Sequence, residues 1–285
     1  MKVSATIAET KAAVAQARAE GARIGFVPTM GALHAGHLSL VERSRREAGF
    51  TVMSIFVNPL QFGPGEDLSR YPRPVEDDER LAGEAGVDLI FRPDVAEMYD
   101  SQRTVTVTAG ALGSHWEGSS RPGHFDGVLT VVAKLFNIVQ PDIAVFGRKD
   151  LQQAALVQAM VRDLNMPLEI VLSPIVREAD GLALSSRNRY LSPDERRSAA
   201  MLNRALRAVV RRFDDGERNV AALEEAGKSV IAKDSGIVLD YLAVIDTGTF
   251  ENPDVADSGN SAIIAARVGS TRLIDNMILG RNDQD

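Results

Sequence analysis

The feature that most constrains the fold is the alternation of short apolar runs with helical patterns in the first half of the chain. Strand-like runs lie at 24–27, 52–57, 89–91, 143–146 and 168–172. Helical patterns precede and separate them, at 7–19, 38–48, 75–85, 128–139 and 151–164. Continuous apolar strands separated by helices are typical of a parallel sheet covered on both faces. We therefore expect an α/β fold that binds its ligands beyond the carboxyl ends of the strands.

The pattern changes after about Pro174. Two helices are expected at 192–213 and 220–233, and three strand-like runs follow at 238–245, 262–268 and 271–278. A Gly-Ser pair at 269–270 favours a tight hairpin between the last two runs. We predict a parallel-sheet domain over residues 1–174 and a smaller α+β domain over residues 175–285, with a hinge at Ser173-Pro174.

The amino-acid composition argues against several classes of function. A net charge of −7 argues against general nucleic-acid binding. The arginines of the 192–213 helix are interpreted as a solvated face rather than a nucleic-acid patch, because acidic residues lie beside them. The absence of cysteine excludes disulfides and thiolate metal sites. The N-terminus lacks the apolar run of a signal peptide, and no apolar stretch reaches 18 residues. We expect a cytoplasmic protein without membrane or nucleic-acid partners.

Two of the four histidines, His34 and His37, lie in the segment PTMGALHAGH at residues 28–37. A buried strand precedes this segment and a helix follows it. The first N–H groups of a helix and its dipole favour an anion at such a turn. Gly36 removes side-chain bulk where a ligand approaches the backbone, and imidazoles donate hydrogen bonds to phosphate oxygens. The segment therefore predicts a nucleotide phosphate site. The alternatives are incidental turn or core histidines, and a zinc pair, for which the chain offers no cysteine and no nearby third histidine.

Two other segments are rich in hydrogen-bond donors. Gly147-Arg148-Lys149-Asp150 follows the fourth strand, where Lys149 can interact with phosphate oxygens and Asp150 can cap the next helix. Residues 179–188, ADGLALSSRN, combine a turn signal with two hydroxyls and an arginine, which suit a pyrophosphate. A surface turn is the alternative for the second segment.

Two segments are more ambiguous. Residues 121–125, RPGHF, are interpreted as a mobile loop over the cleft. The carboxylates at 76–79 are typical of a solvated helix start. Magnesium ligation by Asp77 or Asp78 is the other interpretation of this cluster.

Taken together, five segments closely resemble the pantoate–β-alanine ligase (pantothenate synthetase) family. They occur in the family's order, as PTMGALHAGH, SIFVNPLQF, RPGHFDGV, GRKD followed by LQQ, and READGLALSSRN. The family belongs to the HxGH nucleotidyltransferase superfamily, so the resemblance implies a Rossmann-like first domain and a C-terminal lid. Position 148 departs from the family, which usually has Glu or Gln where this chain has Arg148.

The resemblance implies an ATP-dependent condensation of pantoate with β-alanine through a pantoyl adenylate, with Mg²⁺ and as a homodimer. His37, His34, Lys149 and Arg187 would be the catalytic residues, with His37 as general acid. Gln61 and Gln153 would bind pantoate, and Gln61 also β-alanine. The residues that would bind ATP are Met30, Gly31, Ala32, Leu33, His34, Ala35, Gly36, His37, Gly147, Arg148, Lys149, Asp150, Val176, Leu184, Ser185, Ser186 and Arg187.

Two functions of other classes stay open from the sequence. One is a nucleotidylyltransferase that keeps the nucleotide on its product, which the histidine segment would equally allow. The other is a non-catalytic nucleotide-binding module, against which the intact His34, His37, Lys149 and Arg187 argue.

Overall fold

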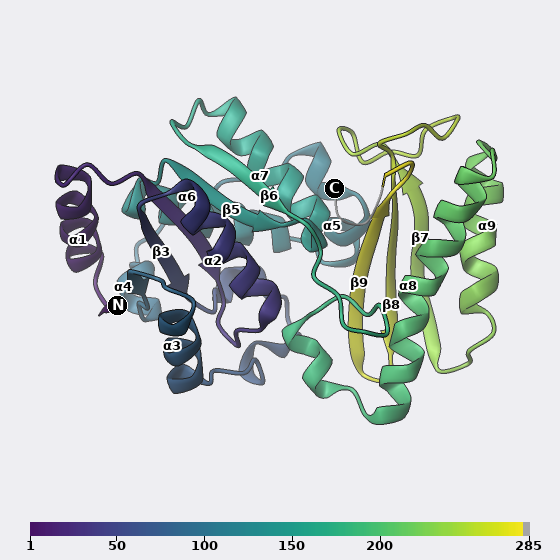
Figure 1. Ribbon diagram of the computed structural model, residues 1–285, viewed down its shortest axis with the longest axis horizontal. Coiled ribbons are helices and arrows are strands. Elements are labelled where there is room, and N and C mark those ends of the chain that lie inside the picture. Colours follow the sequence, from purple (N-terminus) through teal and green to yellow (C-terminus); the bar gives the residue numbers. More distant parts are fainter. Residues whose placement is uncertain (282–285) are drawn as a thin grey trace. The chain divides into compact units, whose positions relative to one another are not determined.

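The computed structural model describes residues 1–281, and the chain divides into two compact units (Figure 1). The first unit comprises Met1–Gly147 and Gln153–Ser173. The second begins at Pro174 and also includes the short segment Arg148–Gln152. The chain therefore passes from the first unit into the second at Arg148, returns to the first at Gln153 and enters the second again at Pro174. The prediction had included Arg148–Gln152 in the first domain. The last four residues of the predicted 175–285 domain lie outside the described residues.

The first unit is built on a six-stranded parallel sheet of order β1-β4-β3-β2-β5-β6. Its strands are β1 Lys2–Ser4, β2 Ile24–Thr29, β3 Phe50–Ile55, β4 Leu89–Phe91, β5 Ile143–Gly147 and β6 Glu169–Ser173. The strand order reverses between β2 and β5, which are paired through Gly25 and Ile143. Open parallel sheets bind ligands at such a switch point. The carboxyl ends of β2 and β5 therefore mark where a ligand is expected.

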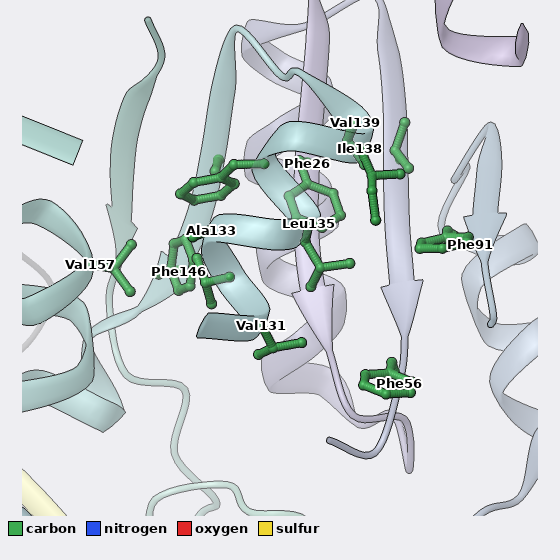
Figure 2. Packing of buried hydrophobic residues seen from close by; sticks show 14 of the residues in the cluster. Phe26, Phe56, Phe91, Val131, Ala133, Leu135, Ile138, Val139, Phe146 and Val157 are labelled. Carbon is green, nitrogen blue, oxygen red and sulfur yellow. The ribbon is translucent and has the colours of Figure 1, made fainter. Parts of the chain in front are cut away.

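Helices cover both faces of this sheet. The helices of this unit are α1 Ile7–Ala19, α2 Ala35–Glu47, α3 Val75–Glu84, α4 Val95–Met98, α5 Trp116–Ser120, α6 His124–Val139 and α7 Leu151–Asp163. Consecutive strand residues belong to different apolar clusters, because strand side chains alternate between faces. Phe26 packs with α6 and α7 residues, whereas Val27 packs with α2 and α3 residues. Figure 2 shows the first cluster, in which Phe26 and Phe146 lie beside side chains of α6.

The second unit is a three-stranded antiparallel sheet with two helices. Its elements are α8 Pro193–Asp214, α9 Val220–Ile231, β7 Ile237–Ile245, β8 Ser261–Val268 and β9 Thr271–Ile278, in sheet order β7-β8-β9. Ser192 caps α8 in a reciprocal capping box with Glu195. The apolar stripe of α8 packs on the sheet, so this unit has a core of its own.

Five short 3₁₀ helices complete the described secondary structure. They are η1 Pro59–Gln61, η2 Asp67–Ser69, η3 Ala111–Ser114, η4 Arg148–Asp150 and η5 Ser186–Tyr190. In residues 1–281, no helix is long and apolar enough to cross a membrane.

The predicted fold class is confirmed, with differences at several boundaries. The second strand of the prediction runs over Phe50–Ile55 rather than 52–57. The helix predicted to begin at residue 38 begins at Ala35, because the side chain of His34 caps it. The prediction of a loop at 121–125 is wrong in part. His124 and Phe125 form the first turn of α6, which begins after Gly123 in a left-handed conformation.

Candidate active site

The segment Met30–His37 connects β2 to α2 at the switch point of the sheet. His34 is the N-cap of α2, and its Nδ1 accepts a hydrogen bond from the Gly36 backbone N–H at 3.2 Å. The rings of His34 and His37 lie close together, with their centroids 4.1 Å apart. The first turn of α2 thus places both imidazoles where the positive end of the helix dipole lies. This arrangement is chemically suited to an anion such as a phosphate.

Asp78, in the first turn of α3, fixes the conformation of the loop that connects β2 to α2. Its carboxylate accepts hydrogen bonds from the backbone N–H groups of Ala32, at 2.8 Å, and Leu33, at 2.7 Å. Gly31 and Ala32 both have positive φ, of 81° and 51°, which is uncommon for alanine. A Cβ on Gly31 would lie 2.7 Å from Asp78 Oδ2. The buried carboxylate therefore stabilises a backbone conformation that the sequence would otherwise disfavour.

Gln61 lies at the end of η1, directly beyond β3, and is buried. Its Nε2 donates to Sδ of Met30 at 3.2 Å, and its Oε1 accepts from Nδ2 of Asn58 at 3.1 Å. Asn58 is itself held, because its Nδ2 donates to Gly127 O and its Oδ1 accepts from the Tyr99 hydroxyl. The loops after β2 and β3 are therefore joined through side chains, and the Gln61 amide has a defined orientation.

Arg121 and His124 bind the backbone carbonyl of Gln61. The Gln61 carbonyl accepts from His124 Nδ1 at 2.8 Å and from Arg121 Nη2 at 3.2 Å. Arg121 forms an ion pair with Glu66 at 2.7 Å. A glycine is required at position 127, because a Cβ there would lie 2.3 Å from the Leu60 carbonyl oxygen. The RPGHFDGV segment thus holds the backbone of Gln61 in place. The prediction of a mobile loop at 121–125 did not include this role.

His124 is neutral and in one tautomer. Nδ1 faces a carbonyl oxygen and must carry the proton, so Nε2 accepts from Arg121 Nη1 at 3.0 Å. Burial, together with the positive charge of Arg121, lowers the pKa of His124 to about 4. Burial likewise raises the pKa of Tyr99 to about 12, which keeps its hydroxyl a donor to Asn58. Near pH 7, the His124 imidazole and the Tyr99 hydroxyl therefore do not change protonation state, and each keeps the same hydrogen-bond partners.

Gln153 occupies the first turn of α7 and is half-buried. It belongs to the first unit, as does Gly147 at the carboxyl end of β5. The chain passes from Gly147 through η4 to α7, so Gln153 follows β5 as Gln61 follows β3.

The second unit holds the other predicted ATP residues. Residues 176–184 form a hairpin in which Leu184 N–H donates to the Val176 carbonyl at 3.0 Å. The turn of this hairpin lies at Asp180-Gly181, where Gly181 has a φ of 90°. The hairpin therefore pairs Val176 with Leu184, although eight positions separate them. Ser185 follows directly and caps η5, in which Ser186 is buried and Arg187 occupies the second position.

The carboxylates predicted as metal ligands differ in their surroundings. Both Asp78 oxygens accept backbone N–H groups, whereas Asp77 is exposed and lies 3.4 Å from Arg80. Over residues 1–281, no group of three or more His, Asp or Glu side chains is arranged to hold a metal ion. Magnesium ligation by Asp77 or Asp78 stays a prediction.

Comparison with known proteins finds relatives that match nearly the whole chain. A family model described as pantoate-beta-alanine ligase matches residues 2–278. The chain belongs to the pantoate–β-alanine ligase family. Pantothenate synthetase of Caldicellulosiruptor saccharolyticus is 51% identical over 279 residues, which cover 98% of this chain and 99% of that protein. The relative from Acidobacterium capsulatum is 52% identical over 291 residues, covering 98% and 97%.

Solved structures of the family superpose on nearly the full length of the chain. Pantothenate synthetase from Thermus thermophilus is 50% identical, with a TM-score of 0.93 and coverage of 97% of this chain and 99% of that one. The ligase from Francisella tularensis, described as complexed with beta-gamma ATP and beta-alanine, is 31% identical, with a TM-score of 0.81 and coverage of 99% of both chains. The predicted family and enzyme class are therefore confirmed.

Sequence reasoning missed the residues that orient Gln61. Asn58 and Gly127 stood inside segments that were noted, but neither was given a role. An Asn-Pro pair directly after a strand is a turn signal that would have drawn attention to Asn58. No sequence signal indicated Tyr99, because its hydroxyl reaches Asn58 only through the tertiary fold.

We predict that Asp78→Ala destabilises the first unit and lowers ATP-dependent activity. The substitution leaves two buried N–H groups without an acceptor, so the free energy of unfolding should fall by about 2 kcal/mol or more. Asp77→Ala is the matched control, and its exposed side chain should change stability by less than about 0.5 kcal/mol. Urea unfolding measures the stability of the two variants, and turnover of ATP measures their activity. Equal stability of the two variants would contradict the role given to Asp78.

We predict that His124 contributes to acid sensitivity. Its pKa is depressed in the folded state, so the unfolded chain binds the proton more readily and stability falls as pH drops from 6.5 towards 4. Between pH 7.5 and 5, the wild-type enzyme should lose about 2 kcal/mol more than His124→Gln, which keeps a donor without titrating. Urea unfolding monitored by Trp116 fluorescence measures this. Parallel losses in the two proteins would refute the prediction.

Proposed function

We propose that the enzyme condenses pantoate with β-alanine in two chemical steps. In the first, a pantoate carboxylate oxygen attacks the α-phosphorus of ATP, and the bond to the bridging oxygen of pyrophosphate breaks. In the second, the β-alanine amine attacks the acyl carbon of the resulting pantoyl adenylate. The amide forms, AMP leaves and the amine loses a proton. The observation that carries this proposal is the full-length match to the family, with the histidine segment at the switch point of the sheet.

The first step brings an anionic carboxylate to an anionic triphosphate, so positive donors must offset the charge that develops. His34 and His37 offer imidazole donors at the start of α2. In our proposal, His37 donates to the phosphates as pyrophosphate departs and His34 assists it. Lys149 and the run Ser185–Arg187 act on the same phosphates, while Gly147, Val176 and Leu184 contact the nucleoside.

Neutral amide side chains suit the hydroxyl and carboxylate groups of pantoate. We assign Gln61 and Gln153 to pantoate, because amides bind hydroxyl and carboxylate groups without neutralising the attacking oxygen. The fixed orientation of the Gln61 amide, set by Asn58 and Met30, supports this assignment. Gln61 also serves β-alanine in the proposal, and the Francisella tularensis relative is described as a complex with beta-alanine.

The nucleotide enters the proposal as its magnesium complex. The role of Asp78 in the loop supports assigning the ion to the ATP phosphates rather than to this carboxylate. If Asp77→Asn changes the Mg²⁺ concentration that the enzyme needs for activity, Asp77 is a ligand of the ion. A homodimer and a cytoplasmic location stay predictions.

The products separate this function from a nucleotidylyltransferase. Mass spectrometry after incubation with ATP, pantoate and β-alanine should detect pantothenate, AMP and pyrophosphate. A stable nucleotidylated product would instead favour the transferase, and absence of ATP turnover would favour a binding module.

We predict that pantoate alone supports exchange of labelled pyrophosphate into ATP, because activation precedes amide formation. The measurement is radioactivity recovered in ATP with and without β-alanine. A requirement for β-alanine would show that the adenylate step is not separable.

We predict that His37→Ala lowers the rate of adenylate formation by about 10²-fold or more, since a preorganised donor is typically worth several kcal/mol in the transition state. ATP binding should weaken far less. Single-turnover kinetics and ATP titration measure the two effects. His37→Gln keeps a donor without a titratable proton, so its rate separates hydrogen bonding from acid catalysis. A folded His37→Ala enzyme with the wild-type single-turnover rate would remove His37 from the site.

A further inference from the structure

Two adjacent polar side chains are buried in β9, the last strand of the chain. Asp275 and Asn276 are 5% and 4% exposed, although β9 lies at one edge of its sheet. Buried polar groups destabilise a fold unless they are hydrogen-bonded. Both side chains form hydrogen bonds to residues outside the sheet.

Asn276 binds the segment that carries Lys149. Its Nδ2 donates to the carbonyl oxygens of Arg148 and Lys149, both at 3.0 Å. One amide therefore fixes two consecutive peptide groups of η4. Residues 148–152 group with the second unit, in which these two hydrogen bonds lie, although the first unit precedes and follows them in the sequence.

Arg177 orients Asn276 and connects it to the hairpin that precedes Ser185. Its guanidinium forms a two-bond ion pair with Asp275, at 2.7 and 3.1 Å, and donates to the Asn276 carbonyl at 3.1 Å. It also donates to the Gly181 carbonyl at 3.2 Å. The backbone N–H of Asn276 donates to Asp275 Oδ1 at 2.8 Å, so the pair and the amide form one network.

The charge of Lys149 is coupled to this network. Burial raises the pKa of Asp275, and the positive charges of Arg177 and, more weakly, Lys149 act in the opposite direction. The charges of Arg177 and Lys149 therefore both favour the ionised form of Asp275.

We propose that Asn276 is a positioning residue for Lys149, and that the Asp275–Arg177 pair holds Asn276 in place. The proposal rests on the function of Lys149 proposed above. The Lys149 ammonium lies at the end of a flexible four-carbon side chain, so its position depends on the backbone from which it starts. Fixing the carbonyls of residues 148 and 149 fixes that starting point. A displacement of about 1 Å in a catalytic group costs about 10²-fold in rate.

The test uses the full chain and compares two buried asparagines of the second unit. Asn276→Leu removes the donor to Arg148 and Lys149. Asn260→Leu is the matched control, because Asn260 is also buried but accepts from the nearby Asp257 N–H at 2.8 Å. Both variants leave backbone groups without partners, so both should melt at a lower temperature than the wild type. Both substitutions are also combined with Lys149→Ala.

The readouts are the single-turnover rate of pantoyl adenylate formation, with enzyme in excess, and the KM for pantoate. We expect Asn276→Leu to slow adenylate formation by about 10-fold or more while the KM for pantoate stays within about 2-fold. Asn260→Leu should keep the wild-type rate. In the Lys149→Ala enzyme, adding Asn276→Leu should slow the reaction by less than about 3-fold, because the group it positions is already gone.

Three results would overturn the proposal. One is an equal rate loss from Asn276→Leu with and without Lys149, which indicates a general structural effect. Another is an equal loss in Asn260→Leu. The third is an unchanged rate in Lys149→Ala, which leaves Asn276 nothing to position. Failure of the proposed function is distinct from these, since the wild-type enzyme itself would then form no adenylate.

Discussion

The hydrogen bonds from the Ala32 and Leu33 N–H groups to Asp78 are the contact on which the histidine segment depends. The chain must turn from β2 into α2 within a few residues, and it does so through two residues of positive φ. Without an acceptor, the buried N–H groups of this turn would make the conformation unfavourable. With the carboxylate in place, His34 reaches the N-cap position and both imidazoles face the same helix start. A residue of α3 therefore determines the geometry at the end of β2.

The same arrangement recurs at two other predicted sites, Gln61 and Lys149, where polar side chains without a predicted substrate contact hold the residue or its backbone. Asn58 orients the Gln61 amide, and Arg121 and His124 hold its carbonyl. Asn276 holds the peptide groups around Lys149. Such supporting shells matter because catalytic groups must be placed to within a fraction of an ångström. The five family segments thus contain both the residues assigned to substrate and many of those that position them.

Much of the fold could be predicted from the sequence, because apolar periodicity and turn residues act locally. The strand-to-helix turn at Met30–His37 was predicted, but the early start of α2 at Ala35 was not, since imidazole is not among the preferred N-cap groups. β1 was missed because it has three residues and two of them are exposed. Arg148–Gln152 groups with the second unit, where Asn276 binds two of its carbonyl oxygens, and no local sequence pattern indicates this contact. The proposed catalytic roles rest on the resemblance to the family, because side-chain chemistry at a turn does not by itself identify a substrate.

The contact between Asn276 and Lys149 also has a consequence for how the enzyme is made. The two residues are 127 positions apart, so Lys149 leaves the ribosome long before the strand that carries Asn276 exists. At roughly 5–20 residues per second, this interval lasts roughly 6–25 s. During that time the parallel sheet can form while η4 lacks the amide that fixes it. If Asn276 positions Lys149, a nascent chain reaches the full rate of adenylate formation only when β9 is added. Incomplete chains would then consume ATP more slowly than the finished enzyme.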